Sequence, residues 1–206
     1  MESQTEKLHK DVPRAMLDAI VERVEELYHS VEPLTSEALR KHRKLARQLS
    51  LMSPTEELIC ELESKTGAHL TNWLLDLPFH LQSAGMTSEA VQHQRFWAHI
   101  LERSNFLGDR AIILAEAGME DEALRQIAEL DIDFPDDAWV QIKIGDALFA
   151  LNEFDRAANR YRRVFQSSKD DYDRHGALER LLPIERYRES SVVETYDVHK
   201  QGHDKC

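Results

Sequence analysis

Two Glu-x-x-His pairs near the start of the chain combine residue types and a spacing that suit metal chemistry. Glu6 precedes His9 and Glu26 precedes His29, so on a helix each pair shares one face. Di-iron helical bundles use this spacing, together with a further Glu from each of two facing helices. The alternative is that these are exposed residues of ordinary helices. The pairs make a metal-dependent enzyme or a metal carrier one hypothesis for the function.

A second group of metal-ligating residues lies at the end of the chain. His199, His203 and Cys206 follow one another at steps of four and three, a spacing at which their side chains could meet around zinc. Three ligands on a loose tail make a weak site. Metal binding, or catalysis that depends on it, is therefore kept as the alternative function.

The familiar catalytic signatures do not occur in the sequence. It contains no Gly-rich phosphate loop, no Gly-x-Ser-x-Gly elbow and no Cys-x-x-Cys pair. The two cysteines, Cys60 and Cys206, give no disulfide framework and favour a reducing compartment. We therefore expect a protein that is not an enzyme and that has no cofactor.

Composition favours long helices, which must position any site that the chain has. Seven Gly and six Pro punctuate 206 residues, and strand-like alternation is nearly absent. The N-terminal MESQTEKLHK has no apolar signal-peptide core, and no apolar run approaches the roughly 18 residues of a membrane span. A net charge of −12 repels phosphate backbones. We expect a cytoplasmic protein with no membrane and no nucleic-acid partner.

A period of 33 to 34 residues organises the middle of the chain. Residues 84–91, AGMTSEAV, return as AGMEDEAL at 117–124, and a looser copy, LNEFDRAA, follows at 151–158. Each copy predicts a helix that ends at Gly or Asn, a tight turn, and a second helix with an acidic start and a buried Ala. The flanking apolar positions keep the same spacing: Leu81, Leu114 and Leu148 before the turn, and Trp97, Leu130 and Val164 after it.

With this period, residues 71–170 resemble the tetratricopeptide repeat, a helix-turn-helix unit of about 34 residues. The best-matching positions are Gly145, Ala157 and Tyr161 in one repeat and Ala111, Ala123, Ile127 and Pro135 in the preceding one. The chain departs from the family pattern at two places. The slot of the usual Trp holds Gln141, with Trp139 two residues earlier. Pro78 occupies a small-residue slot, where we expect it to kink or divide its helix.

The resemblance implies an all-α fold, a right-handed helix-turn-helix solenoid with N-terminal helices and a C-terminal capping helix. We expect an N-terminal helical region at 1–67, the repeat domain with its capping helix at 68–188, and a flexible tail at 189–206. Among the N-terminal helices, one is expected to begin with Thr35 or Ser36 as its cap. Another is expected to begin at a capping box headed by Ser53 and to end at Gly67.

The resemblance also implies a concave groove lined by the first helix of each repeat. The implied groove residues are Asn105, Ile112, Glu116, Trp139, Ile142, Asp146 and Phe149. A peptide or a helix held there would make the protein an interaction adaptor or scaffold, including an assembly factor of the chaperone type. The alternative is that the protein's own N-terminal or final helix fills the groove, because burial of large apolar side chains favours that too.

The charge of the implied groove bears on the kind of partner. Family members that clamp the acidic C-termini of heat-shock chaperones use Lys, Arg and Asn on this wall. Here Ile112, Glu116, Ile142 and Asp146 stand instead, so we expect no binding of such acidic tails. A basic or amphipathic protein partner fits better.

Charge is also unevenly distributed along the sequence. Residues 40–47 hold five Lys and Arg, whereas residues 116–137 hold nine acidic residues and the single base Arg125. The basic run is either a solvated helix face or a contact surface. If it is a contact surface, it could attract the acidic stretch of a second copy and give head-to-tail self-association.

Overall fold

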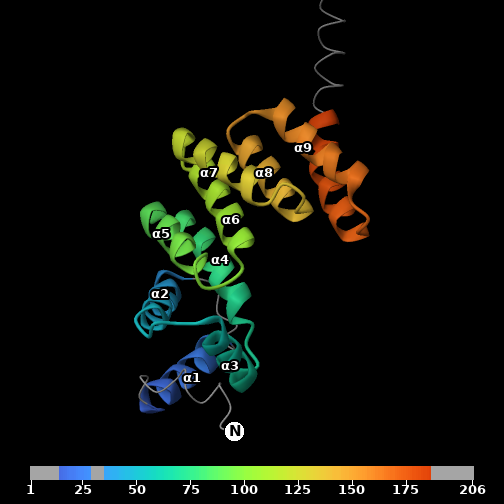
Figure 1. The fold of residues 1–206 in the computed structure, drawn as a ribbon. Helices are drawn as coiled ribbons and strands as arrows, with labels where there is room; N and C mark the ends of the chain where they lie inside the picture. Colours follow the sequence, from blue (N-terminus) through green and yellow to red (C-terminus); the bar gives the residue numbers. More distant parts are fainter. Residues whose placement is uncertain (1–13, 29–34, 187–206) are drawn as a thin grey trace, which may run out of the picture. The chain divides into compact units, whose positions relative to one another are not determined.

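The computed structural model describes residues 14–28 and 35–186, and every element of secondary structure in these ranges is a helix (Figure 1). The described residues form ten helices and no strand, so the prediction of an all-α protein is confirmed. The chain divides into two compact units, residues 1–107 and 108–206, with the boundary inside α6 (Arg103–Glu116). The predicted limits at residues 67 and 188 stay predictions, and the predicted tail lies outside the described residues.

In its described part, unit 1 contains five complete helices and the first residues of α6. The helices are α1 (Arg14–Tyr28), α2 (Ser36–Ser50), α3 (Glu56–Thr66), α4 (Leu70–Ser83) and α5 (Thr87–Trp97). Their apolar faces meet in a leucine-rich core that includes Leu45, Leu49, Leu58, Leu62 and Leu74. Burial of each of these side chains contributes about 1.5–3 kcal/mol, which is why the amphipathic sequences fold against one another.

Threonine hydroxyls begin two of these helices. Thr35 accepts a hydrogen bond from the backbone N–H of Ala38 at the start of α2, as expected, and Thr55 accepts one from Leu58 at the start of α3. The predicted capping box at Ser53 is wrong, because Ser53 takes a positive φ of 48° and α3 begins three residues later. Gly67 ends α3 in the left-handed conformation, as the sequence predicts.

Pro78 lies inside α4 without dividing it, since the helix continues from Leu70 to Ser83. Proline has no N–H, so the carbonyl oxygen of Leu74, four residues earlier, loses its partner within the helix. The Nε2 atom of His93, on α5, lies 2.9 Å from that oxygen. A side chain from the neighbouring helix therefore replaces the missing backbone bond, which is a physical reason why α4 tolerates the proline.

The three repeated turns have the same geometry. Gly85, Gly118 and Asn152 have φ values of 78°, 72° and 63°, so each takes the left-handed conformation. In each turn the next residue donates its N–H to the carbonyl of the repeated leucine, at 2.8 Å for Leu81 and 2.9 Å for Leu114 and Leu148. A second bond, from the left-handed residue itself, completes the Schellman motif that ends a helix.

The other positions that recur with the period lie in the core. The three leucines before the turns, the alanines after them and the large apolar residues further on are all at most 2% exposed. The alanines are Ala90, Ala123 and Ala157, and the large residues are Trp97, Leu130 and Val164. Matching turns and matching buried residues confirm the helix-turn-helix period itself.

Unit 2 begins with the rest of α6 and continues through α7 (Glu120–Asp133), α8 (Ala138–Ala150), α9 (Phe154–Ser167) and a final helix over residues 171–186. Helices α8 and α9 pack tightly at Gly145 of α8, because a Cβ atom there would lie 2.3 Å from Cε1 of Tyr161. Only glycine fits under that ring. The Tyr161 ring of α9 packs directly on the backbone of α8 at Gly145. This contact agrees with the small residue that the repeat resemblance places there.

Candidate functional site

The structure places six of the seven predicted groove residues in unit 2 and the seventh, Asn105, in unit 1. Asn105 is partly exposed, and its side-chain amide donates to Glu102, the residue before the start of α6. Ile112 is partly exposed and Glu116 is exposed, both on α6. The other four residues, Trp139, Ile142, Asp146 and Phe149, lie on α8.

The final helix covers the first part of the predicted groove wall on α8. Trp139 packs against Tyr172 of that helix, with ring centroids 5.5 Å apart. A Cβ atom added to Gly176 would lie 3.2 Å from the Trp139 ring and 3.7 Å from the Cδ1 atom of Ile142, so the final helix approaches α8 closely there. Ile142 is fully buried. At these two residues, the protein's own final helix occupies the surface that the family resemblance assigns to a groove.

Asp146 is held in a network that joins α8, α9 and the final helix. The hydroxyl of Tyr161 donates to its Oδ1 at 2.8 Å, and Nε of Arg180 lies 2.8 Å and 3.0 Å from its two carboxylate oxygens. The guanidinium of Arg180 also lies 5.7 Å from the centroid of the Trp139 ring, a cation–π distance. Asp146 and Trp139 are therefore engaged in fastening the final helix.

Burial governs the protonation of this network. It raises the pKa of Asp146, against the opposing effects of Arg180 and the Tyr161 hydroxyl. It also raises the pKa of Tyr161, and the neighbouring Asp146 carboxylate raises it further. Tyr161 therefore stays a hydrogen-bond donor throughout the physiological range.

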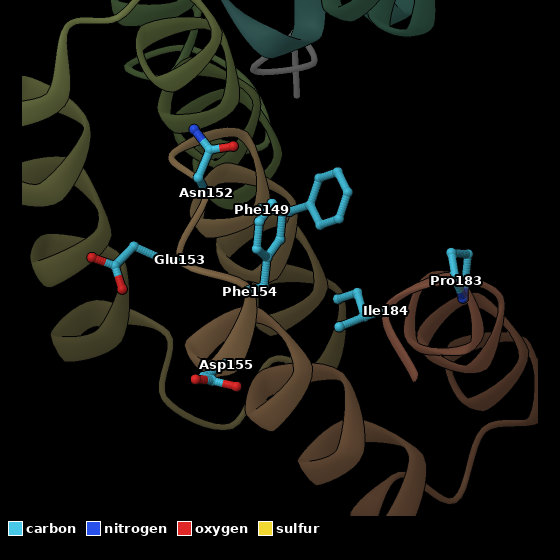
Figure 2. Close-up of a pocket in the computed structure, with 7 residues that line it drawn as sticks. All are labelled: Phe149, Asn152, Glu153, Phe154, Asp155, Pro183 and Ile184. Atoms are coloured by element: carbon cyan, nitrogen blue, oxygen red, sulfur yellow. The ribbon is translucent and has the colours of Figure 1, made fainter. Parts of the chain in front are cut away.

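Phe149 is the predicted groove residue on α8 that opens onto a pocket (Figure 2). It is 46% exposed, its neighbour Phe154 is 38% exposed, and their rings meet edge to face with centroids 5.2 Å apart. Pro183 and Ile184 of the final helix form the facing wall of a cavity of about 610 Å³. Such a cavity can accept one or two large apolar side chains of a partner.

Acidic residues accompany this apolar surface. The turn between α8 and α9 and the first turn of α9 place Glu153 and Asp155 in the lining, with Asn152 beside them. Figure 2 shows the two phenyl rings between these polar residues and the final helix. We name this site the Phe149 pocket. It consists of Phe149, Asn152, Glu153, Phe154, Asp155, Pro183 and Ile184.

Most of the Phe149 pocket was not predicted from the sequence. Phe154 could have been found, because it is a large apolar residue at the start of α9, directly after the polar turn residues Asn152 and Glu153. Pro183 and Ile184 lie outside the repeats, and their place depends on how the final helix packs. No local pattern reports that packing.

Unit 1 contains a pocket of about 350 Å³ that is rich in histidine, with His42, His69, His80 and Asp76 among its lining residues. Nε1 of Trp73 donates to Nδ1 of His42 at 2.8 Å. Burial lowers the pKa of His42, and the neighbouring His80 lowers it further. A neutral His42 that accepts this bond keeps its proton on Nε2 and is therefore not free to bind a metal through that nitrogen.

The metal ligands suggested by the sequence are not placed by the structure. His9, His29, His199, His203 and Cys206 lie outside the described residues, as does Glu6, and the side chain of Glu26 is not described. Within the described ranges, no group of three or more His, Cys, Asp or Glu side chains is arranged to hold a metal ion.

Among the described helices, none has both the length and the apolar character needed to cross a bilayer. No protein-family model, curated protein or solved structure matches the chain.

Proposed function

We propose that the chain is an interaction module of the tetratricopeptide kind, not an enzyme, and that it holds a protein partner at the Phe149 pocket. Its helix pairs would stack as a right-handed solenoid, with the final helix as its cap. The identical turns at Gly85, Gly118 and Asn152 support this proposal, because equal turns join helices in equal ways. The contact between Gly145 and Tyr161 also supports it, because it packs the two helices of one pair closely against each other.

The observation that carries the proposal is the exposure of Phe149 and Phe154 beside a cavity. Two adjacent phenyl groups that are about half exposed leave apolar surface in water, and covering the remainder would contribute roughly 1 kcal/mol for each ring. Aromatic residues in a pocket are typical anchor points of protein interfaces. A single apolar side chain of a partner, inserted between the rings and Ile184, would use this surface.

The acidic lining selects the chemistry of the partner. Glu153 and Asp155 would attract a Lys or Arg next to the inserted apolar residue, whereas an acidic chaperone tail would be repelled. At long range, the net charge of −12 likewise attracts basic partners and repels the phosphates of nucleic acids. We therefore propose a basic or amphipathic segment of another protein as the partner, with no role for a membrane.

The test is a pull-down from the native cell extract with the wild-type chain and two matched variants. Phe149→Asp places a charge in the pocket, while Phe165→Asp changes an exposed phenylalanine of α9 that does not line it. We expect the wild type and Phe165→Asp to retain the same partner and Phe149→Asp to lose it. Equal recovery with all three proteins would refute the pocket as the binding site.

A further inference from the structure

The exposed face of α2 is a basic stripe that ends in an aliphatic residue. Arg40, Lys44, Arg47 and Leu51 follow one another at steps of four, three and four, which aligns them along one side of a helix. All four are exposed, and Leu51 is 71% exposed. The opposite face of α2 is buried in unit 1 through Leu39, Leu45 and Leu49.

A second stripe with the same spacing lies on α7, among acidic residues of that helix. Asp121, Arg125, Ala128 and Ile132 are all exposed and repeat the steps of four, three and four. Ile132 is 78% exposed. Six of the fourteen residues of α7 are acidic and one is basic, whereas α2 has five basic residues and one acidic residue in fifteen.

The basic member of the α7 stripe does not reverse this charge. Nη2 of Arg125 lies 3.6 Å from Oε1 of Glu122, which offsets its positive charge. Glu129 and Asp133 flank Ile132, and both are exposed. The two helices that carry the stripes are therefore opposite in charge, basic for α2 and acidic for α7, and each stripe places one aliphatic side chain in solvent at its C-terminal end.

We propose that the α2 stripe of one copy of this chain binds the α7 stripe of a second copy. Parallel alignment sets Leu51 against Ile132 and Arg40 against Asp121, and it brings Arg47 beside Glu129. It also sets Lys44 against Arg125, whose positive charge Glu122 offsets. The second copy is favoured as the occupant because the same chain carries both complementary surfaces with the same spacing. An acidic cluster alone would select no particular partner, but the two stripes select each other.

Such a contact is heterologous, since it joins two different surfaces. An open assembly keeps one unused stripe at each of its two ends, so association continues into chains or closes into a ring. The contact is largely exposed and charged, so it is expected to weaken as salt screens it. The dissociation constant should rise roughly tenfold between about 0.05 M and about 0.5 M salt.

Sedimentation equilibrium of the full chain tests the proposal with variants at two exposed positions. Leu51→Glu disables the α2 stripe and Ile132→Lys disables the α7 stripe. In low salt the wild-type mass should rise with concentration, while each variant alone should stay monomeric. A mixture of the two variants should form a heterodimer and nothing larger, because one intact stripe of each kind remains.

A matched control changes an exposed leucine elsewhere. Leu182→Glu, in the final helix, should associate like the wild type. The proposal is overturned if the wild type stays monomeric in low salt. A chain whose two stripes paired with each other would give this result. It is equally overturned if both single variants still associate, or if their mixture stays monomeric while the wild type associates.

Discussion

His93 replaces the hydrogen-bond donor that Pro78 cannot supply. The carbonyl oxygen of Leu74 would bond the N–H of residue 78 in a regular helix, and Nε2 of His93 lies 2.9 Å from it instead. Because a carbonyl oxygen can only accept, Nε2 of His93 must carry the proton of this bond. Burial lowers the pKa of His93 to about 4, against the opposing effects of this bond and of Glu89.

The first prediction is that the effects of changes at His93 and Pro78 are not additive. His93→Leu leaves a buried carbonyl without a donor and should lower the free energy of unfolding by about 1–3 kcal/mol. In a Pro78→Ala background the backbone N–H can bond Leu74, so the same change should cost at least about 1 kcal/mol less. Amide hydrogen exchange in α4 and α5 measures both costs. Equal costs in the two backgrounds would show that His93 does not serve this carbonyl.

The second prediction concerns pH. The pKa of His93 is lower in the folded protein than its ordinary value of 6.5, so the unfolded chain binds the proton more tightly. Stability is therefore fully present above about pH 6.5 and is lost as the pH falls toward 4. Between pH 7 and pH 5 the loss from His93 should be about 1–2 kcal/mol.

The control for this pH effect is His93→Gln, which cannot gain a proton. His42 also has a lowered pKa and contributes a loss of the same sign, so the difference between the wild type and His93→Gln isolates the part due to His93. Urea unfolding at both pH values measures it. Parallel pH dependence in the two proteins would contradict the assignment.

The third prediction compares two buried glutamines, Gln94 on α5 and Gln126 on α7. Gln94 is fully buried, and neither polar atom of its amide has a hydrogen-bond partner. Gln126, also buried, accepts from Arg110 and donates to Glu129 at 3.1 Å. Gln94→Leu should stabilise the protein by about 1–2 kcal/mol, and Gln126→Leu should destabilise it by a similar amount. Thermal unfolding of the two variants decides whether their signs are opposite.

The fourth prediction concerns the fastening of the final helix in unit 2. Arg180→Gln removes the ion pair with Asp146 and the contact with the Trp139 ring, so hydrogen exchange should accelerate across residues 171–186. Tyr161→Phe should have a smaller effect, about 1 kcal/mol, because it removes one hydrogen bond. Arg174→Gln, at an exposed pair with Asp171, is the control and should change little. If Arg180→Gln exchanges like the control, the network does not hold the helix.

The turns and the repeating core could be predicted because they depend on local rules. A left-handed residue must end each first helix, and only Gly or Asn accepts that conformation readily, so Gly85, Gly118 and Asn152 were identifiable. The buried alanines followed from the same period. The start of α3 was mispredicted because Ser53 and Thr55 are both good caps, and the backbone at Ser53 takes a conformation that no composition rule reveals.

The candidate site was only partly predictable, because it depends on tertiary packing. Phe149 was identified from its place in the repeat, but whether Trp139 and Ile142 are open or covered depends on where the final helix lies. That helix approaches through Gly176 and is fastened by Arg180, two contacts between residues more than thirty positions apart. Pro183 and Ile184 enter the pocket for the same reason.

The most direct test of the central claim is to observe the Phe149 pocket while it binds. A basic, amphipathic peptide would be selected from a random display library on the wild-type chain and then added to isotope-labelled protein for NMR. The account predicts saturable shifts of the Phe149 and Phe154 ring signals and the Ile184 methyl, with no change at Phe165, and loss of binding in Phe149→Asp. Saturable binding that leaves Phe149, Phe154 and Ile184 unshifted would contradict the account.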